Sequence, residues 1–283
     1  MSMIINTNVD AIFAQNALTL NNQSQTQAMQ QLSTGSQINN ASDNAAGLSI
    51  SQTMTSQING LGQAIDNAND AINMLQTADA SMSTQSTMLQ TMRTLAIQAT
   101  TGTYSASQRT YMNDEYQNLA AQVTAISSQT SWNNMTLLNG KIGSGTNTSQ
   151  VTFQVGANSG DTITATITST SLKSLMGGVS SVGSLLSVSS ANSTLALIDT
   201  ALAAVNSTRA NIGGVVNQLT FATDNLNAVK QNETASRSQI TDTDYAKATT
   251  NLAKDQIISQ AASAMLAQAN QEGQNVLSIL KSA

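Results

Sequence analysis

The sequence predicts a mainly α-helical protein: a long, coiled-coil-like helical rod with paired N- and C-terminal helices and a small β-hairpin region in the middle of the chain. Three observations predict this fold class. The 283 residues include no Pro, and Pro breaks helix interiors. Apolar residues recur at alternating spacings of three and four over long stretches, which is the spacing of a helical seam. Only a short stretch near residues 150–168 alternates apolar and polar residues with the period of a strand.

The first long helix is predicted over about 55 residues, which corresponds to a length of about 80 Å. Its caps are predicted at Ser42 and Asp43, and Gly102 is predicted to end it. One row of its seam continues to residue 96, whereas the other row contains Asp79 and Arg93 and is therefore weaker. The seam consists of Ile58, Leu61, Ile65, Ala68, Ile72, Leu75, Met82, Leu89 and Ala96. Met74, Met82, Met88 and Met92 fill irregular gaps in the core rather than hold a cofactor.

Two further helices follow the same spacing. Ser105 and Gln108 fit a capping box at the start of the second helix. Arg209 and Thr223 interrupt the seam of the third, which is predicted from residue 195. The apolar positions are Met112, Tyr116, Leu119, Val123 and Ile126 in the second, and Leu195, Ile198, Leu202, Val205, Ile212, Val216, Leu219 and Leu226 in the third.

Between these helices the pattern changes to that of a hairpin. Apolar residues alternate with polar ones on both sides of a turn at residues 156–161, which is typical of two antiparallel strands. The alternating residues are Val151, Phe153, Val155, Ile163, Ala165 and Ile167. Residues 171–190 are rich in Ser and Gly and are left without an assignment.

The two ends of the chain each carry a narrow apolar stripe on a polar helix, with Asn8 as a possible cap of the first. Such a stripe buries too little surface to be stable alone. Either each end packs on the core of its own chain, or the two ends pack on each other and then on neighbouring subunits. The predicted self-assembly residues are Ile5, Val9, Ile12, Phe13 and Leu20 at one end and Ile258, Met265, Val276 and Leu280 at the other.

Composition excludes several classes of function. Charged residues make up 9% of the chain, against about 25% in typical soluble domains. With a net charge of −5 and no basic stripe, we expect no nucleic-acid partner. No stretch approaches the ~18 apolar residues of a membrane span, so we expect no membrane partner. The N-terminus lacks the basic and apolar regions of a secretory signal.

The absence of Cys and His removes thiolate nucleophiles, His-dependent triads and the usual zinc motifs. The sequence therefore predicts no catalytic residues, no metal and no cofactor. Neighbouring acids such as Asp114 with Glu115, or Asp242 with Asp244, do not face each other on a helix. We expect them to cap helices or face solvent.

Residues 31–39 resemble the sequence Arg-Leu-Ser-Ser-Gly-x-Arg-Ile-Asn, and residues 41–48 resemble its continuation Ala-Lys-Asp-Asp-Ala-Ala-Gly-Leu. In these and further segments, in the right order and over nearly the whole chain, the sequence resembles bacterial flagellins. Further matching blocks are Asn67-Ala68-Asn69-Asp70, Leu89–Ala96, Phe153-Gln154-Val155-Gly156-Ala157, Ser236–Asp244 and Ala264–Gln271. Gln31 and Gln37 stand where the family usually has Arg, so which ion pairs hold a filament of this chain is open.

The resemblance implies a fold and a role. Similar proteins form the extracellular filament of the bacterial flagellum and leave the cell through a type III export channel, which would explain a missing signal peptide. Their organisation implies an axial terminal-helix domain at 1–40 and 246–283, a helical rod domain at 41–170 and 191–245, and a short variable outer tip at 171–190. A hook-associated junction protein and an adhesin or immune ligand remain alternative functions.

The resemblance also implies partners. These are other copies of the chain, a flagellar secretion chaperone on the C-terminal helix, and the filament cap and hook-junction proteins. A weak interaction with the Toll-like flagellin receptor is implied too, because Thr91 and Thr94 replace charged residues of the family's contact segment. The implied receptor contacts are Leu89, Gln90, Arg93, Leu95 and Glu115.

Overall fold

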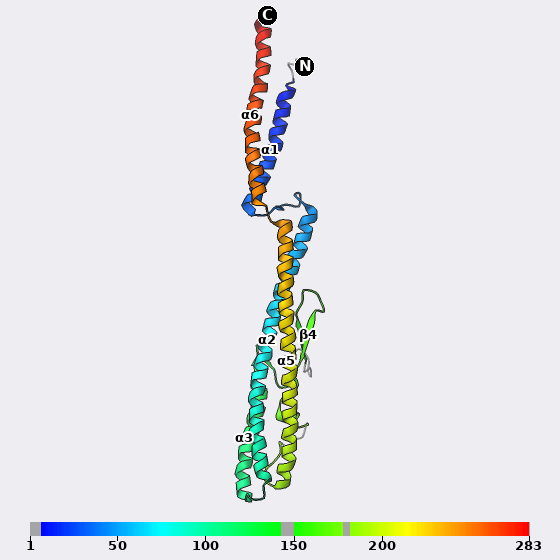
Figure 1. The fold of residues 1–283 in the computed structure, drawn as a ribbon, viewed down its shortest axis with the longest axis vertical. Coiled ribbons are helices and arrows are strands. Elements are labelled where there is room, and N and C mark those ends of the chain that lie inside the picture. The colour runs from blue at the N-terminus through cyan, green and yellow to red at the C-terminus, as the bar shows by residue number, and fades with distance from the viewer. Residues whose placement is uncertain (1–6, 143–149, 178–181, 283) are drawn as a thin grey trace. The chain divides into compact units, whose positions relative to one another are not determined.

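The computed structural model describes residues 7–142, 150–177 and 182–282, with side chains described through residue 271. It confirms a mainly helical protein with a small β region in the middle of the chain (Figure 1). The helices are α1 (Val9–Thr34), α2 (Ala45–Thr100), α3 (Ala106–Gln129), α4 (Leu172–Leu175), α5 (Val188–Thr241) and α6 (Tyr245–Ser282). The strands are β1 (Ser131–Trp132), β2 (Met135–Thr136), β3 (Gln150–Gln154) and β4 (Thr162–Thr166).

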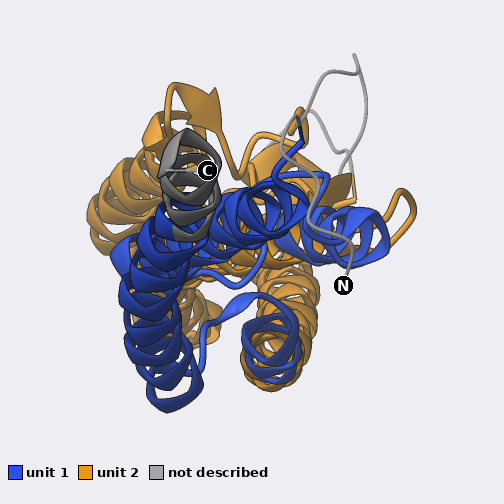
Figure 2. Cartoon of the chain, turned by 90° about the horizontal axis from the view of Figure 1, so that it is seen from above, with its two compact units in different colours: residues 1–56, 232–283 blue, residues 57–231 orange. Residues whose placement is uncertain are grey.

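The chain divides into two compact units, coloured separately in Figure 2. The terminal unit comprises residues 1–56 and 232–283, and the central unit comprises residues 57–231. Both boundaries fall inside long helices, α2 and α5. The terminal unit is therefore larger than the axial domain expected at 1–40 and 246–283, whose limits stay a prediction.

The core of the central unit is aliphatic, as the composition predicted. In α2 the row Leu75, Met82, Leu89 and Ala96 is fully buried. The second buried row is Ala71, Ala78, Gln85, Met92 and Ala99, one residue before the row through Asp79 and Arg93 that the seam predicted. The sequence had marked the row through Asp79 and Arg93 as the weaker one, and it did not predict this additional buried row, which forms because α2 packs against both α3 and α5. Contact with two helices buries a wider face than a two-stranded seam does.

The capping box of α3 is confirmed. The Ser105 hydroxyl accepts a hydrogen bond from the backbone N–H of Gln108, whose side chain accepts one from the N–H of Ser105. Tyr116 and Val123 of the predicted seam are fully buried. The helix is thus fixed at its start by local hydrogen bonds and along its length by the core.

The third predicted helix, α5, begins seven residues before the predicted start, at Val188. The hydroxyl of Ser187 accepts a hydrogen bond from the N–H of Ser190 at 3.1 Å, which caps the helix. Its buried row Ile198, Val205, Ile212, Leu219 and Leu226 confirms the predicted seam. By length and mean hydropathy (1.2 over its most apolar 18 residues) α5 could also cross a membrane, a test that core helices of soluble proteins also pass.

The cap predicted at the start of α2 was wrong. The helix begins at Ala45, and the side-chain oxygen of Asn44 accepts a hydrogen bond from the N–H of Gly47 at 2.9 Å. Asp43 instead accepts from the backbone N–H groups of Asn39 and Asn40, at 3.0 and 2.9 Å. At the other end α2 stops at Thr100, before Gly102 is reached.

The predicted hairpin is formed by β3 and β4, which are antiparallel with Phe153 opposite Ile163. It lies on α2, where the side-chain amide of Asn67 donates to the carbonyl of Gln154 at 3.3 Å. At Gly60 an added Cβ would lie 3.2 Å from the Cβ of Ala157. Gly60 therefore allows the loop of the hairpin to approach the helix closely.

A second hairpin, β1–β2, was not predicted. Its turn residues Asn133 and Asn134 have positive φ angles of 45° and 65°. Two residues of positive φ are typical of a type I′ hairpin turn, for which Asn is well suited. The Asn-Asn pair was the sequence signal for this turn.

The segment that the sequence left unassigned contributes to the core of the central unit. Within its described residues, Leu172, Leu175, Met176 and Leu185 are buried. The N–H of Leu185 donates to the side-chain oxygen of Asn113 at 3.0 Å. The role of residues 171–190 as a variable outer tip stays a prediction.

Candidate assembly surface

In the terminal unit, α1 and α6 lie side by side and antiparallel (Figure 1). The side-chain amide of Asn8 donates to the carbonyl of Ala269 at 2.9 Å, and that of Asn21 donates to the carbonyl of Asp255 at 2.7 Å. Asn8 also caps α1, as predicted, by accepting from the N–H of Ala11. Of the two alternatives for the chain ends, the structure supports pairing with each other.

The surface buried between these helices is small and partly polar. It includes Asn21, Ala28 and Ala248, each less than a tenth exposed. The large apolar side chains lie elsewhere. Phe13 is 69% exposed, Leu20 65% and Met265 65%. Pairing the two helices thus satisfies polar groups and leaves the apolar stripes uncovered.

The other predicted assembly residues share this exposure where they are described. Val9, Ile12 and Ile258 are all exposed, and Ile257 is exposed although the sequence did not single it out. Ile5 and the side chains of Val276 and Leu280 lie outside the described residues. The stripe therefore runs along both helices, and no element in the described part of the chain covers it.

Backbone hydrogen bonds join the segment that follows α1 to the last residue of α5 and to the link between α5 and α6. The N–H of Gln37 donates to the carbonyl of Thr241 at 2.7 Å, and the N–H of Thr243 donates to that of Gly35 at 2.9 Å. Gly35 has a φ of +70°, which ends α1 in the left-handed conformation that favours glycine. Asp244 caps α6 by accepting hydrogen bonds from the N–H groups of Ala246 and Lys247. This agrees with the expectation that Asp244 caps a helix.

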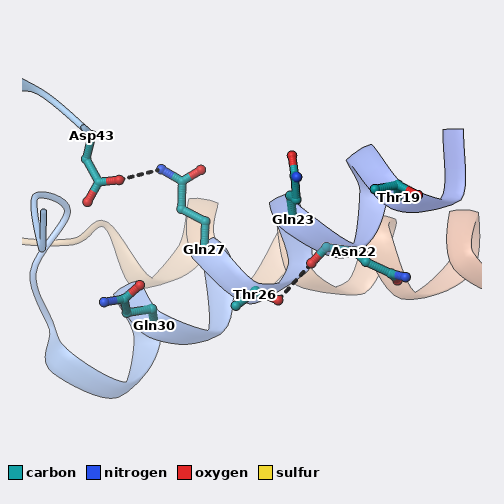
Figure 3. A pocket seen from close by; sticks show the side chains of 7 residues that line it. All are labelled: Thr19, Asn22, Gln23, Thr26, Gln27, Gln30 and Asp43. Carbon is teal, nitrogen blue, oxygen red and sulfur yellow. Dashed lines mark hydrogen bonds between the residues drawn. The ribbon is translucent and has the colours of Figure 1, made fainter. Parts of the chain in front are cut away.

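A shallow polar groove of about 490 Å³ runs along the outer side of α1 (Figure 3). One amide side chain, Gln27, donates to a carboxylate oxygen of Asp43 at 3.4 Å. The groove offers amide and hydroxyl groups but no arrangement suited to acid–base chemistry. Its lining residues are Thr19, Asn22, Gln23, Thr26, Gln27, Gln30 and Asp43. Within the described part of the chain, no group of three or more acidic residues could hold a metal ion.

The receptor-contact candidates fall into two groups. Leu89 is fully buried and Leu95 is 8% exposed, so neither is available to another protein in this fold, which corrects the prediction for both. The periodicity already placed Leu89 in the seam. Gln90, Arg93 and Glu115 are exposed. Arg93 is also engaged within the chain, with its Nε 2.7 Å from a carboxylate oxygen of Asp199.

Two family models match most of the chain. The bacterial flagellin N-terminal helical region matches residues 5–142, and the bacterial flagellin C-terminal helical region matches residues 195–280. The chain belongs to the bacterial flagellin family. As a flagellin it has a structural role in the flagellar filament, which lies outside the bacterial cell.

Flagellins of known sequence match this one from end to end. It is 38% identical to the flagellar filament 33 kDa core protein of Treponema phagedenis, with 99% of this chain and 100% of the relative covered. Identity is 37% to the flagellin of Bacillus subtilis and 36% to that of Halalkalibacterium halodurans, with the same coverage. This flagellin therefore has no large insertion relative to those proteins.

Solved structures agree with the fold. The crystal structure of Bacillus cereus flagellin matches with a TM-score of 0.50 at 30% identity, covering 57% of this chain and 88% of that one. A putative flagellar hook-associated protein of Vibrio parahaemolyticus matches with a TM-score of 0.59 at 14% identity, covering 71% and 100%. The second likeness shows a shared fold alone, so it does not favour the junction-protein alternative.

Proposed function

We propose that this flagellin polymerises with copies of itself and that the exposed stripes of α1 and α6 form the contacts. The observation that supports this proposal is the exposure of Phe13, Leu20 and Met265 on a pair of helices whose mutual interface is small and partly polar. Apolar surface of this kind is stabilised by burial, at about 25 cal/mol for each Å² removed from water. Neighbouring subunits in a filament supply the burial that the single chain lacks.

The low charge of the chain favours close association of copies. Ten basic and fifteen acidic residues are spread over 283 positions, and net charge is what keeps like proteins apart. The two ends also lie in one unit, so one contact surface is built from both. We expect both ends to become fully ordered only on polymerisation, since coupled folding occurs when a partner buries the apolar face.

Truncation tests this function. Removing residues 1–40 or 246–283 should leave a soluble protein that no longer sediments as filaments, whereas the full chain does. The matched point variants are Leu20→Ser, which should weaken polymerisation, and Gln15→Ser, an exposed polar position on the same helix, which should not. Filaments of normal diameter from either truncation would refute the proposal.

Before polymerisation the same C-terminal stripe suits a secretion chaperone. Ile258 and Met265 are exposed on one amphipathic helix, which is the form that binds an apolar groove. A peptide of residues 246–283 should capture the flagellar chaperone, and Met265→Asp should abolish capture. Failure of the unchanged peptide to bind would count against this partner. The cap and hook-junction proteins, as neighbours in the assembly, would contact the same stripes.

Weak binding to the Toll-like flagellin receptor would use the exposed candidates Gln90, Arg93 and Glu115. Replacing an interfacial Arg typically costs about 2 kcal/mol, or on the order of 30-fold in affinity, so Thr91 accounts for a weak interaction. A reporter-cell dose response should show higher potency for the Thr91→Arg, Thr94→Glu double variant. Equal potency would mean that this surface does not govern recognition.

A further inference from the structure

A second uncovered apolar feature lies on α5 in the central unit. Phe221 is 73% exposed, although the chain has only three Phe residues. Phe13, the other exposed Phe, lies on the proposed assembly stripe, whereas Phe153 packs against the core. Phe221 is the most exposed of the large apolar side chains that the structure describes, and an aromatic side chain of this size stabilises a contact when a partner buries it.

Two adjacent glycines, Gly213 and Gly214, lie in the interior of the same helix. Glycine is the least favourable residue for a helix interior after proline. Neither glycine has a positive φ, and a Cβ added at either one would meet nothing within 4 Å. Neither the backbone conformation nor the packing of the chain therefore requires glycine here. What the pair does provide is bare helix backbone that another surface can approach.

The glycines and the Phe lie on one face. Gly214 and Phe221 are seven residues apart, which is two helical turns, and both face away from the buried residues Ile212 and Leu219. Asn217, between them, is exposed and uncharged. A bulky side chain and a bare stretch of backbone thus adjoin on the outer side of α5.

We infer that this face of α5 is a contact between copies of the chain, in which Phe221 of one copy packs against the backbone at Gly213 and Gly214 of another. The inference rests on the proposed function, because subunits of a polymer are surrounded by copies of themselves. Both halves of the contact lie on every chain, and no charged side chain separates them. When Phe221 of each copy packs on the glycines of the next copy in a head-to-tail arrangement, the contact repeats along a series of copies, as a filament requires.

Disulfide trapping tests the geometry, because the natural chain has no Cys. Full-length Phe221→Cys and Gly214→Cys proteins are mixed, polymerised and oxidised. We expect a mixed disulfide dimer in the pelleted polymer and none in the dilute monomer. The matched control pairs Phe221→Cys with Ala196→Cys, an exposed position on α5 roughly 37 Å from residue 221 along the helix, which should not cross-link. Polymers that form without the Phe221–Gly214 disulfide would overturn the inference.

Substitutions test the energetics of the contact, because they should affect the stability of the monomer and the stability of the polymer differently. Gly213→Ala and Gly214→Ala should each raise the monomer Tm by about 2–4 °C, since alanine favours the helix, yet raise the critical concentration for polymerisation. Phe221→Ser should leave the monomer Tm unchanged and raise the critical concentration at least tenfold, as expected for a buried aromatic anchor. Unchanged critical concentrations in all three variants would overturn the inference.

The wild-type chain separates the two proposals. If the wild type sediments as filaments and the variants polymerise as well as the wild type, the inference fails and the proposed function stands. If the wild type does not polymerise, both fail. If only the variants lose polymerisation, both are supported.

Discussion

The guanidinium Nε of Arg209 lies 2.8 Å from a carboxylate oxygen of Asp79, joining α5 to α2. A second ion pair joins the same helices, with Arg93 on α2 and Asp199 on α5 at 2.7 Å. Each helix thus contributes an acid to one pair and a base to the other. Asp79 and Arg209, which interrupt the two seams in the sequence, are partners in space, and the opposite order of charges in the two pairs favours one antiparallel register.

Exchanging the charges of the first pair tests this role. Both side chains of the pair remain about a third or more exposed, and such pairs contribute at most about 1 kcal/mol. Arg209→Asp should lower the free energy of unfolding by about 1 kcal/mol, because it places two acids together. The Asp79→Arg, Arg209→Asp double variant should recover most of that loss. Urea unfolding followed by circular dichroism measures both, and equal stability of the single and double variants would contradict the pairing.

Gln85 of α2 is fully buried against α3, and only one of the two polar atoms of its side-chain amide forms a hydrogen bond. Its nitrogen donates to the carbonyl of Val123 at 3.0 Å, whereas its oxygen has no hydrogen-bond partner among the described residues. An unpaired buried acceptor costs about 1–3 kcal/mol. Gln85→Met, which keeps the volume without the polar atoms, should therefore stabilise the protein by about 1 kcal/mol.

The matched control is Gln85→Glu, which buries an unpaired charge and should destabilise by at least about 3 kcal/mol. Denaturant midpoints at neutral pH measure both variants. A Gln85→Met protein that is less stable than wild type would show that the amide oxygen has a partner.

The buried position of Tyr116 leads us to expect that the folded protein loses stability at alkaline pH. Its hydroxyl donates to the carbonyl of Val182, and burial raises the pKa of Tyr116 above its usual value. The unfolded chain loses this proton near pH 10, whereas the folded chain retains it. Above pH 10 the unfolded state therefore binds fewer protons, and stability falls as pH rises.

Tyr116→Phe should lose about 1 kcal/mol at pH 8, from the missing hydrogen bond, but should show a smaller further loss between about pH 10 and 11. Tyr111→Phe, an exposed position on the same helix, serves as the control and should retain the wild-type pH dependence. Parallel pH profiles for Tyr116→Phe and wild type would contradict this assignment. Tm measured across the pH range gives the comparison.

Gly183 holds a backbone conformation that other residues rarely adopt. Its φ is +90°, and an added Cβ would lie 2.7 Å from the Oγ1 of Thr194. Gly183→Ala should therefore destabilise by about 1–3 kcal/mol. Gly102→Ala, at a glycine with no positive φ and open space at its Cβ, should change stability by less than about 0.5 kcal/mol. Equal Tm shifts for the two variants would be evidence against strain at residue 183.

The sequence predicted most of the helical fold because its signals are local. The spacing of Ile198, Val205 and Ile212 and the capping box of Ser105 depend on near neighbours in the chain. The second buried row of α2 was not predicted, because a single helix does not reveal how many partners it packs against. Gln85 was missed for a second reason as well, because polar residues are rarely buried and its side chain gave no sign of lying in the core.

The assembly surface could be predicted only in part from the sequence, for a different reason. The stripes of Phe13 and Met265 were visible as periodicity, but the sequence could not tell which side of each helix the partner would cover. Leu89 matched a family contact segment and also the seam, and packing decided that it is buried. The glycine pair at 213 and 214 gave no signal until the space around it was known.

Hydrogen exchange of full-length monomer and sedimented polymer tests the central claim most directly. The amides of residues 9–34 and 245–271 should exchange rapidly in the monomer, because the stripes through Phe13, Leu20 and Met265 lack a covering partner. In the polymer the same amides should exchange at least a hundredfold more slowly, which corresponds to about 2.7 kcal/mol of added protection. Filaments in which these helices exchange as fast as in the monomer would contradict the account.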